Sequence, residues 1–145
     1  MRNKVGKLAE EIVSQWLTVQ GWQILHQRWH CRYGEIDIIA RSLTEDIIIF
    51  VEVKTRGDRN WDQNGLLAIN ERKQAKLILA GEIFLSEYPQ YSDFNCRFDV
   101  TLLKHRPLKS SDGNQQLELT TQLQQTIYYQ GYQFTIVSYI ENAFC

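Results

Sequence analysis

Two apolar stretches decide the fold, EIDIIAR at residues 35–41 and DIIIFVEVKT at residues 46–55. Both are rich in the β-branched and aromatic residues that favour strands. The polar residues between them, SLTE at 42–45, make a connection of hairpin length. The second stretch is almost wholly apolar up to Glu52, as expected of a central strand that is covered on both faces. We therefore expect the two stretches to pair in the middle of a sheet.

Helical patterns lie on either side of these strands. Apolar residues recur at helical spacing over residues 4–20, until Gly21 ends the pattern, and again over residues 69–87, before Pro89. Strand-like composition returns at residues 22–29, 97–103 and 127–140. This order of elements predicts an α/β sandwich in which the helices flank a sheet.

Composition places the chain among ordinary globular proteins, with 43% hydrophobic and 23% charged residues in a length of 145. We expect one domain over residues 1–145, with a polar, variable segment at about 104–125 that no pattern assigns to an element. The three cysteines have no paired spacing and suit a reducing compartment. The longest apolar run, residues 47–51, is too short to cross a bilayer. We therefore expect a cytoplasmic protein without membrane association.

The chemistry is concentrated in the two central strands. Glu52 and Lys54 are two residues apart, so they share one face at the end of an apolar strand. Asp37 lies between Ile36 and Ile38, which we expect on the face opposite to Asp37. Pairing of the two strands would bring Asp37 close to Glu52. The sequence therefore predicts two carboxylates and one amine at a place where its surroundings predict burial.

Such a cluster needs a partner, because neighbouring carboxylates repel each other and are costly to bury alone. A divalent cation resolves both problems, and carboxylate oxygens suit Mg²⁺ or Mn²⁺. The ion would lower the pKa of a coordinated water and stabilise charge on a phosphate oxygen. Lys54 would orient that water or neutralise the transition state. The alternative is a structural ion pair near a sheet edge.

Several other charged residues are candidates for supporting roles. Taking about 100° per helical residue, Glu10 falls at the edge of the apolar stripe of the first helix, where it is an accessory ligand or an ordinary exposed glutamate. Arg56 follows the motif lysine, and Arg72, Lys73 and Lys76 share one face of the second helix. These four cations are candidate phosphate contacts, with a solvated surface as the alternative. The formal net charge of −1 gives no global attraction to nucleic acid.

A few other polar and aromatic residues carry weaker indications. His26 and His30 are four apart, but the segment has strand-like composition, so we expect structural or solvent-facing roles. Arg97 and Asp99 should share a strand face and form an ion pair. Trp61 either stacks on a base or packs over the site.

The two central motifs, GEIDIIA at 34–40 and FVEVKTR at 50–56, strongly resemble those of the YraN-like family of uncharacterised bacterial proteins. That family belongs to the PD-(D/E)xK restriction-endonuclease-like nucleases and is similar to archaeal Holliday junction resolvases. The segments GKLAE at 6–10, GWQIL at 21–25 and RFDV at 97–100 also fit, so the resemblance covers most of the chain. Ile36 replaces the proline of the superfamily motif, and Ala9 stands where family members usually carry glycine.

The resemblance implies an endonuclease-like domain with a restriction-endonuclease-like α/β core, in which helices flank a mixed central sheet. It makes Asp37 and Glu52 metal ligands, with the Val53 carbonyl as a third ligand. It also makes Lys54 the water-positioning residue and Glu10 the accessory acid. The expected function is Mg²⁺- or Mn²⁺-dependent hydrolysis of DNA phosphodiester bonds, at branched or damaged DNA. The alternatives are a non-catalytic DNA-binding or scaffolding module and a homodimeric structural protein.

Overall fold

A computed structural model of the protein describes residues 4–57, 69–109 and 122–144. Within these residues the fold is mixed α/β, with one six-stranded open sheet in the order β1-β2-β3-β4-β6-β5 and two α-helices. Strands β3 and β4 are parallel, and every other neighbouring pair is antiparallel. The elements are α1 (Lys4–Val19), β1 (Trp22–Cys31), β2 (Gly34–Ser42), β3 (Ile47–Gly57), α2 (Glu71–Glu87), the 3-10 turn η3 (Pro89–Tyr91), β4 (Asn95–Pro107), β5 (Thr126–Tyr129) and β6 (Tyr132–Phe144).

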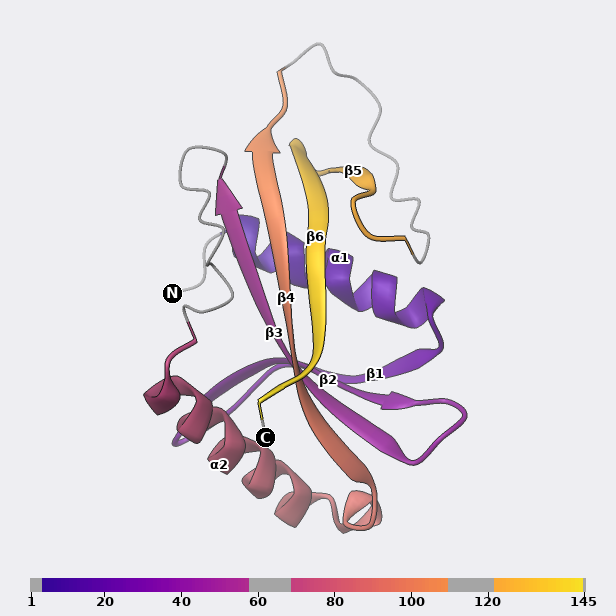
Figure 1. The fold of residues 1–145 in the computed structure, drawn as a ribbon, viewed down its shortest axis with the longest axis vertical. Coiled ribbons are helices and arrows are strands. Elements are labelled where there is room, and N and C mark those ends of the chain that lie inside the picture. Colours follow the sequence, from indigo (N-terminus) through magenta and orange to yellow (C-terminus); the bar gives the residue numbers. More distant parts are fainter. Residues whose placement is uncertain (1–3, 58–68, 110–121, 145) are drawn as a thin grey trace.

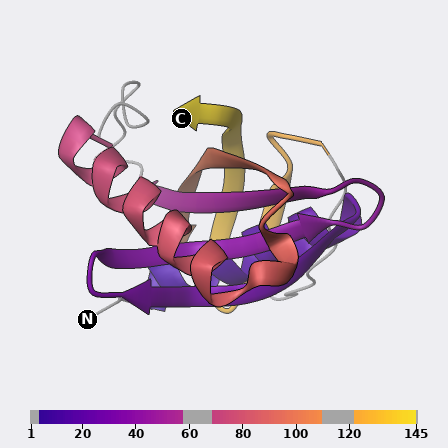
Figure 2. The ribbon, with the colours of Figure 1, turned by 90° about the horizontal axis from the view of Figure 1, so that it is seen from below.

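The two helices cover different faces of the sheet, because the central strand β3 is apolar on both faces. Ile49 and Val51 of β3 pack in the core that α1 covers, whereas Ile48 and Phe50 pack in the core that α2 covers. Figure 1 shows α1 running behind β3, β4 and β6, with β1 and β2 crossing the lower part of the twisted sheet. Figure 2 shows α2 lying across the β1–β2 end. No helix in the described ranges is long and apolar enough to cross a membrane.

The helices and the first three strands confirm the sequence expectations, and their ends have local causes. After α1 the chain turns at Gly21, whose φ of 99° is costly for any residue with a side chain. Helix α2 begins at Glu71, two residues later than its apolar pattern, because Asn70 is its N-cap. The Asn70 side chain accepts a hydrogen bond from the Lys73 N–H at 2.9 Å.

The C-terminal part of the fold divides a stretch that the sequence pattern leaves whole. Residues 127–140, whose composition is strand-like, belong to two strands, β5 and β6, which a tight turn separates. Gln130 and Gly131 have φ angles of 51° and 84°, the pair of positive values that a two-residue hairpin turn requires. Strand-forming tyrosines on both sides mask this turn in the sequence pattern. Strand β4 also extends to Pro107, beyond the predicted end at Leu103, because β6 pairs with it that far.

Candidate functional site

Asp37 lies where strands β2 and β3 part. The two strands pair from Ile38 to Arg41 of β2, and the ladder ends at the Ile38–Val51 pair. Immediately beyond it, the Asp37 carboxylate accepts a hydrogen bond from the Val53 N–H, with a distance of 2.8 Å between Oδ2 and N. A side-chain oxygen thus satisfies a backbone donor of β3 where the ladder has stopped. Asp37 is nevertheless only 4% exposed, so its charge is buried at the edge of the core.

The strand around Asp37 does not alternate as we expected. Ile36 and Ile38 should lie on the same face, yet Ile38 packs in the α1-side core and Ile36 in the α2-side core. The reversal also involves β1, since Arg28 lies opposite Asp37, between the Gln27–Ile38 and Trp29–Ile36 pairs, and has a φ of 52°. An arginine in this left-handed conformation carries strain. The prediction about Ile36 was wrong because strict alternation holds only in an undistorted strand.

Glu52 meets two lysines from different elements. Lys54, which shares its face of β3, has its Nζ 3.6 Å from Glu52 Oε1, as the two-residue spacing predicted. The Nζ of Lys73, in the first turn of α2, donates to the same oxygen at 3.0 Å. Glu52 is 7% exposed, so both ammonium groups face a largely buried carboxylate. The sequence grouped Lys73 with the helix-surface cations, whereas the structure brings it into direct contact with the motif glutamate.

The pKa values of the two lysines shift in opposite directions. Burial lowers the pKa of Lys54, and Lys73 acts in the same direction, while the carboxylates of Glu52 and Asp37 oppose this shift. Burial also acts to lower the pKa of Lys73, but its hydrogen bonds with Lys54 and Glu52 outweigh burial and raise that pKa. Of the two, Lys54 therefore has the amine that loses its proton more readily.

Glu10 is buried at the sheet-facing side of α1 and is 2% exposed. The exposed-surface alternative for this residue is therefore wrong. Its Oε1 lies 3.7 Å from Nε of Arg28, the residue that faces Asp37 across the β1–β2 pair. The sequence did not single out Arg28 as a functional candidate, and an arginine carries no pattern that signals a positive φ. Glu10 thus reaches the Asp37 end of the sheet through Arg28.

Arg56 lies farther along β3. Its Nη1 donates to the carbonyl of its own neighbour Thr55 at 3.2 Å. The Oγ1 of Thr55 is in turn 2.6 Å from Nδ1 of His105. This hydrogen bond joins the ends of the parallel strands β3 and β4. Arg56 remains a partly exposed cation beside the site, and its contact with phosphate stays a prediction.

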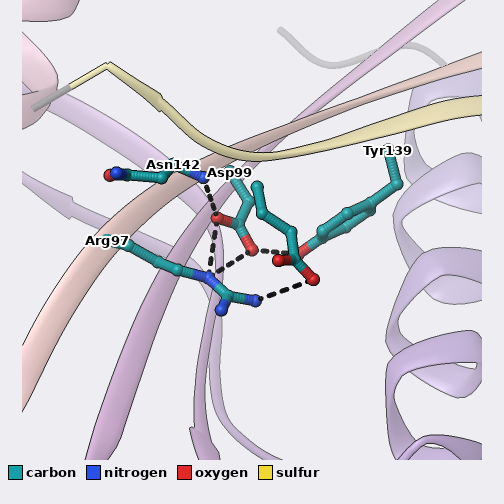
Figure 3. Close-up of polar contacts among 5 residues, drawn as sticks. Arg97, Asp99, Tyr139 and Asn142 are labelled. Atoms are coloured by element: carbon teal, nitrogen blue, oxygen red, sulfur yellow. Dashed lines mark hydrogen bonds and ion pairs between the residues drawn. The ribbon is translucent and has the colours of Figure 1, made fainter.

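Other sequence expectations have separate outcomes. His26 packs edge-on against Phe84, which confirms a structural role. The Arg97–Asp99 ion pair is confirmed, with Nε 3.0 Å from Oδ1, and Figure 3 shows that Tyr139 and the backbone of Asn142 converge on the same carboxylate. Trp61 lies outside the described residues.

Metal-binding capacity depends on few donors. Within residues 4–57, 69–109 and 122–144, no group of three or more His, Cys, Asp or Glu side chains comes together to hold a metal. Asp37 and Glu52 are both buried and both act electrostatically on Lys54, and Mg²⁺ is commonly held by one or two carboxylates together with water. The donor chemistry of these two carboxylates therefore fits Mg²⁺ or Mn²⁺, although the Lys73 ammonium already contacts Oε1 of Glu52.

Comparison with known proteins places the chain in a family. Residues 9–103 match the uncharacterised protein family UPF0102. The chain belongs to this family. UPF0102 proteins of Trichodesmium erythraeum and Acaryochloris marina are 45% and 44% identical to it, over 96% and 97% of this chain and 87% and 90% of theirs. A UPF0102 protein of Synechocystis sp. is 43% identical over 97% of each chain. The region that matches UPF0102 includes Glu10, Asp37, Glu52, Lys54 and Lys73.

Proposed function

We propose that this UPF0102 protein is a cytoplasmic, metal-dependent nuclease of the PD-(D/E)xK, restriction-endonuclease-like type, similar to archaeal Holliday junction resolvases. The substrate would be a DNA phosphodiester, at branched or damaged DNA. The observation that carries the proposal is that two buried carboxylates, Asp37 and Glu52, both act on Lys54 at the point where two central strands part. Burying two carboxylates is costly, and buried charged groups of this kind gather at functional sites.

The metal would be held by Asp37 and Glu52, with the Val53 carbonyl as a third ligand. The N–H of Val53 points toward Asp37, and the N–H and C=O of one strand residue face the same neighbouring strand. The carbonyl of Val53 is thereby directed to the Asp37 side, which supports its role as a ligand. When bound, Mg²⁺ or Mn²⁺ would activate a water and stabilise negative charge on the phosphate oxygens.

The remaining residues have roles that follow from their contacts. Lys54, 3.6 Å from Glu52, would orient the attacking water and balance charge on the phosphate. Because its pKa is lowered and that of Lys73 is raised, Lys54 is the lysine that more readily becomes neutral and could then take a proton from that water. Arg28 would keep Glu10 beside the Asp37 end of β2, where Glu10 would act as the accessory acid.

A second function has one observation in its favour. Two lysines already face Glu52 and also act electrostatically on Asp37, so the charges of both carboxylates are balanced without a metal. A protein that only binds or scaffolds DNA would keep such a pre-neutralised cluster. Metal dependence separates the two functions, because a non-catalytic module binds DNA equally well in the presence of a chelator.

The test is cleavage of labelled linear duplex, single-stranded, flap and four-way-junction DNA with Mg²⁺, with Mn²⁺ and with a chelator. We expect metal-dependent cleavage by the wild type, a loss of about 100-fold or more in Lys54→Met, and no change in Lys7→Met. Lys7 is an exposed lysine of α1 and provides the matched control. Cleavage that persists in Lys54→Met, or an absence of cleavage with chelator-insensitive binding, would contradict the nuclease proposal.

A further inference from the structure

A groove of about 370 Å³ lies between the β1–β2 turn and the first two turns of α2. Its lining consists of residues from these two segments: Tyr33, Gly34, Glu35, Asn70, Arg72, Lys73, Lys76 and Leu77. Three of these residues are cations and one is a carboxylate. The groove is therefore positively charged although the whole chain has a formal charge of −1.

Two of the three cations that line the groove are available for a ligand. Arg72 and Lys76 are exposed and are separated by one helical turn, so they lie on the same face of α2. Among the residues that the structure describes, neither has an ion-pair partner. Exposed, unpaired cations along a concave surface are the usual footprint of a phosphate backbone.

Helix stability does not explain the cations in the first turn of α2. Arg72 and Lys73 occupy the first turn of α2, whose N-terminal end carries partial positive charge. Cations in that turn oppose the helix dipole and so destabilise this end of the helix. The N-cap Asn70 and the acidic Glu71 already supply the favourable chemistry of this end. A ligand with negative charge would offset the unfavourable placement.

The groove leads directly to the candidate site. Lys73 lines the groove, and its Nζ is 3.0 Å from Glu52 Oε1. A polyanion that lies along Arg72 and Lys76 therefore continues toward Lys73, Glu52 and Lys54. Tyr33 adds an aromatic side chain on the opposite wall, held by a 2.9 Å hydrogen bond from Arg32 to its hydroxyl.

We propose that this groove binds the phosphodiester backbone of a nucleic-acid strand beside the bond to be cut, with Arg72 and Lys76 as phosphate contacts. The inference rests on the proposed nuclease function and adds to it the path of the substrate. A strand fits better than an isolated phosphate, because the cations extend along the helix and then into the site. Phosphate contacts of this kind fix the position of the strand without reading its sequence.

The experiment measures binding without turnover, by fluorescence anisotropy of labelled single-stranded and duplex oligonucleotides with a chelator present. The variants are Arg72→Ala/Lys76→Ala, the charge-preserving Arg72→Lys/Lys76→Arg, and the control Lys4→Ala/Lys7→Ala, which removes two exposed charges from α1. We expect the first variant to weaken binding by on the order of tenfold and to reduce the salt slope by about two. The charge-preserving variant and the control should retain binding near the wild-type level.

The outcomes distinguish the groove proposal from the nuclease proposal. If Arg72→Ala/Lys76→Ala loses binding while the wild type never cleaves DNA, the groove proposal is supported and the nuclease proposal fails. If that variant binds normally and the wild type cleaves, the nuclease stands and the groove is wrong. An equal loss in Lys4→Ala/Lys7→Ala indicates diffuse attraction and also overturns the groove. If a deoxynucleoside monophosphate competes as well as the oligonucleotide, the ligand of the groove is a single nucleotide and the proposal of a strand is wrong.

Discussion

At the scale of single residues, the position of Lys73 has the most direct consequence. Its ammonium group lies 3.0 Å from Oε1 of Glu52, one of the two carboxylate oxygens that a metal could use. A cation on a ligand oxygen competes with the metal, because both states need the same negative charge. Because Lys73 lies in the first turn of α2, the position of this helix end affects how available the Glu52 carboxylate is to a metal.

Replacement of Lys73 tests this competition. We expect Lys73→Met, which keeps the apolar stem of the side chain, to bind Mn²⁺ several-fold more tightly than the wild type in calorimetric titrations without DNA. The reason is that Glu52 Oε1 then lacks its closest competing cation. Lys76→Met, which removes a neighbouring charge without a contact to Glu52, is the control. Equal Mn²⁺ affinity in Lys73→Met and wild type would show that no competition exists.

Asp99 provides a second residue-scale prediction. Its carboxylate is 1% exposed and accepts from the Arg97 guanidinium, the Tyr139 hydroxyl and the Asn142 N–H (Figure 3). Burial raises the pKa of Asp99 above its ordinary 3.8, although these hydrogen bonds act in the opposite direction. The folded protein thus holds this proton more tightly than the unfolded chain. The stability that results is fully present below pH 3.8 and declines as the pH rises through the folded-state pKa.

The variant Asp99→Asn tests the contribution of Asp99 to stability and its pH dependence. At neutral pH we expect it to lower the free energy of unfolding by about 1–3 kcal/mol, because an amide NH₂ replaces an oxygen that accepts hydrogen bonds. The stability advantage of the wild type over Asp99→Asn should then shrink as the pH rises from 3.8 through the folded-state pKa. Urea denaturation of the wild type and the variant across this pH range measures the difference in their free energies of unfolding. A difference that grows with pH would contradict the assignment.

At the scale of elements, α2 is held close to the sheet by a small residue. A Cβ atom added at Gly81 would lie 3.0 Å from Phe98 Cζ and 3.3 Å from Phe50 Cε2. These rings cannot easily retreat, since Phe98 is stacked between Phe50 and Phe144. Close packing at this point sets the distance of α2, and with it Lys73, from strand β3.

The substitution Gly81→Ala therefore has a predictable sign. Helix propensity alone would favour alanine by about 1 kcal/mol, but forcing a methyl group into a packed core costs about 1–3 kcal/mol. We expect a net loss of stability in urea denaturation. A gain of the size that helix propensity supplies would mean that the helix can move outward. Ala80→Gly, at a buried neighbouring position, should lose stability through the opposite effect, a cavity with lower helix propensity.

At the scale of the whole molecule, metal binding and folding are linked. The two candidate ligands belong to different strands, β2 and β3, which no longer pair at this point. A metal that binds both should therefore stabilise the folded chain, by about 2.7 kcal/mol at 100 times its dissociation constant. We expect Mn²⁺ to raise the melting temperature of the wild type in scanning calorimetry.

The same measurement has a matched control. Asp37→Asn/Glu52→Gln should show no stabilisation by Mn²⁺, whereas Glu45→Gln, which changes an exposed carboxylate of the β2–β3 loop, should respond like the wild type. Asparagine at position 37 can still accept the Val53 N–H, so the fold is kept. Stabilisation that survives the double substitution would place the metal elsewhere.

The sequence by itself determined the features that depend on neighbours along the chain. The first helix, predicted over 4–20 and found over Lys4–Val19, the central hairpin and the shared face of Glu52 and Lys54 follow from periodicity, which local backbone geometry fixes. The turn at Gln130–Gly131 was missed because the strand-forming tyrosines around it outweigh a single glycine in the pattern.

Only the tertiary structure decided what lies beside the motif. Lys73 is 21 residues from Glu52, and the packing of α2 on the sheet brings their side chains into contact. The end of the β2–β3 ladder at Ile38 leaves the Val53 N–H to Asp37, and the opposed Arg28 breaks the alternation that the sequence implied. The physical reason is that strand register and helix docking depend on contacts between distant segments, which short-range periodicity does not encode.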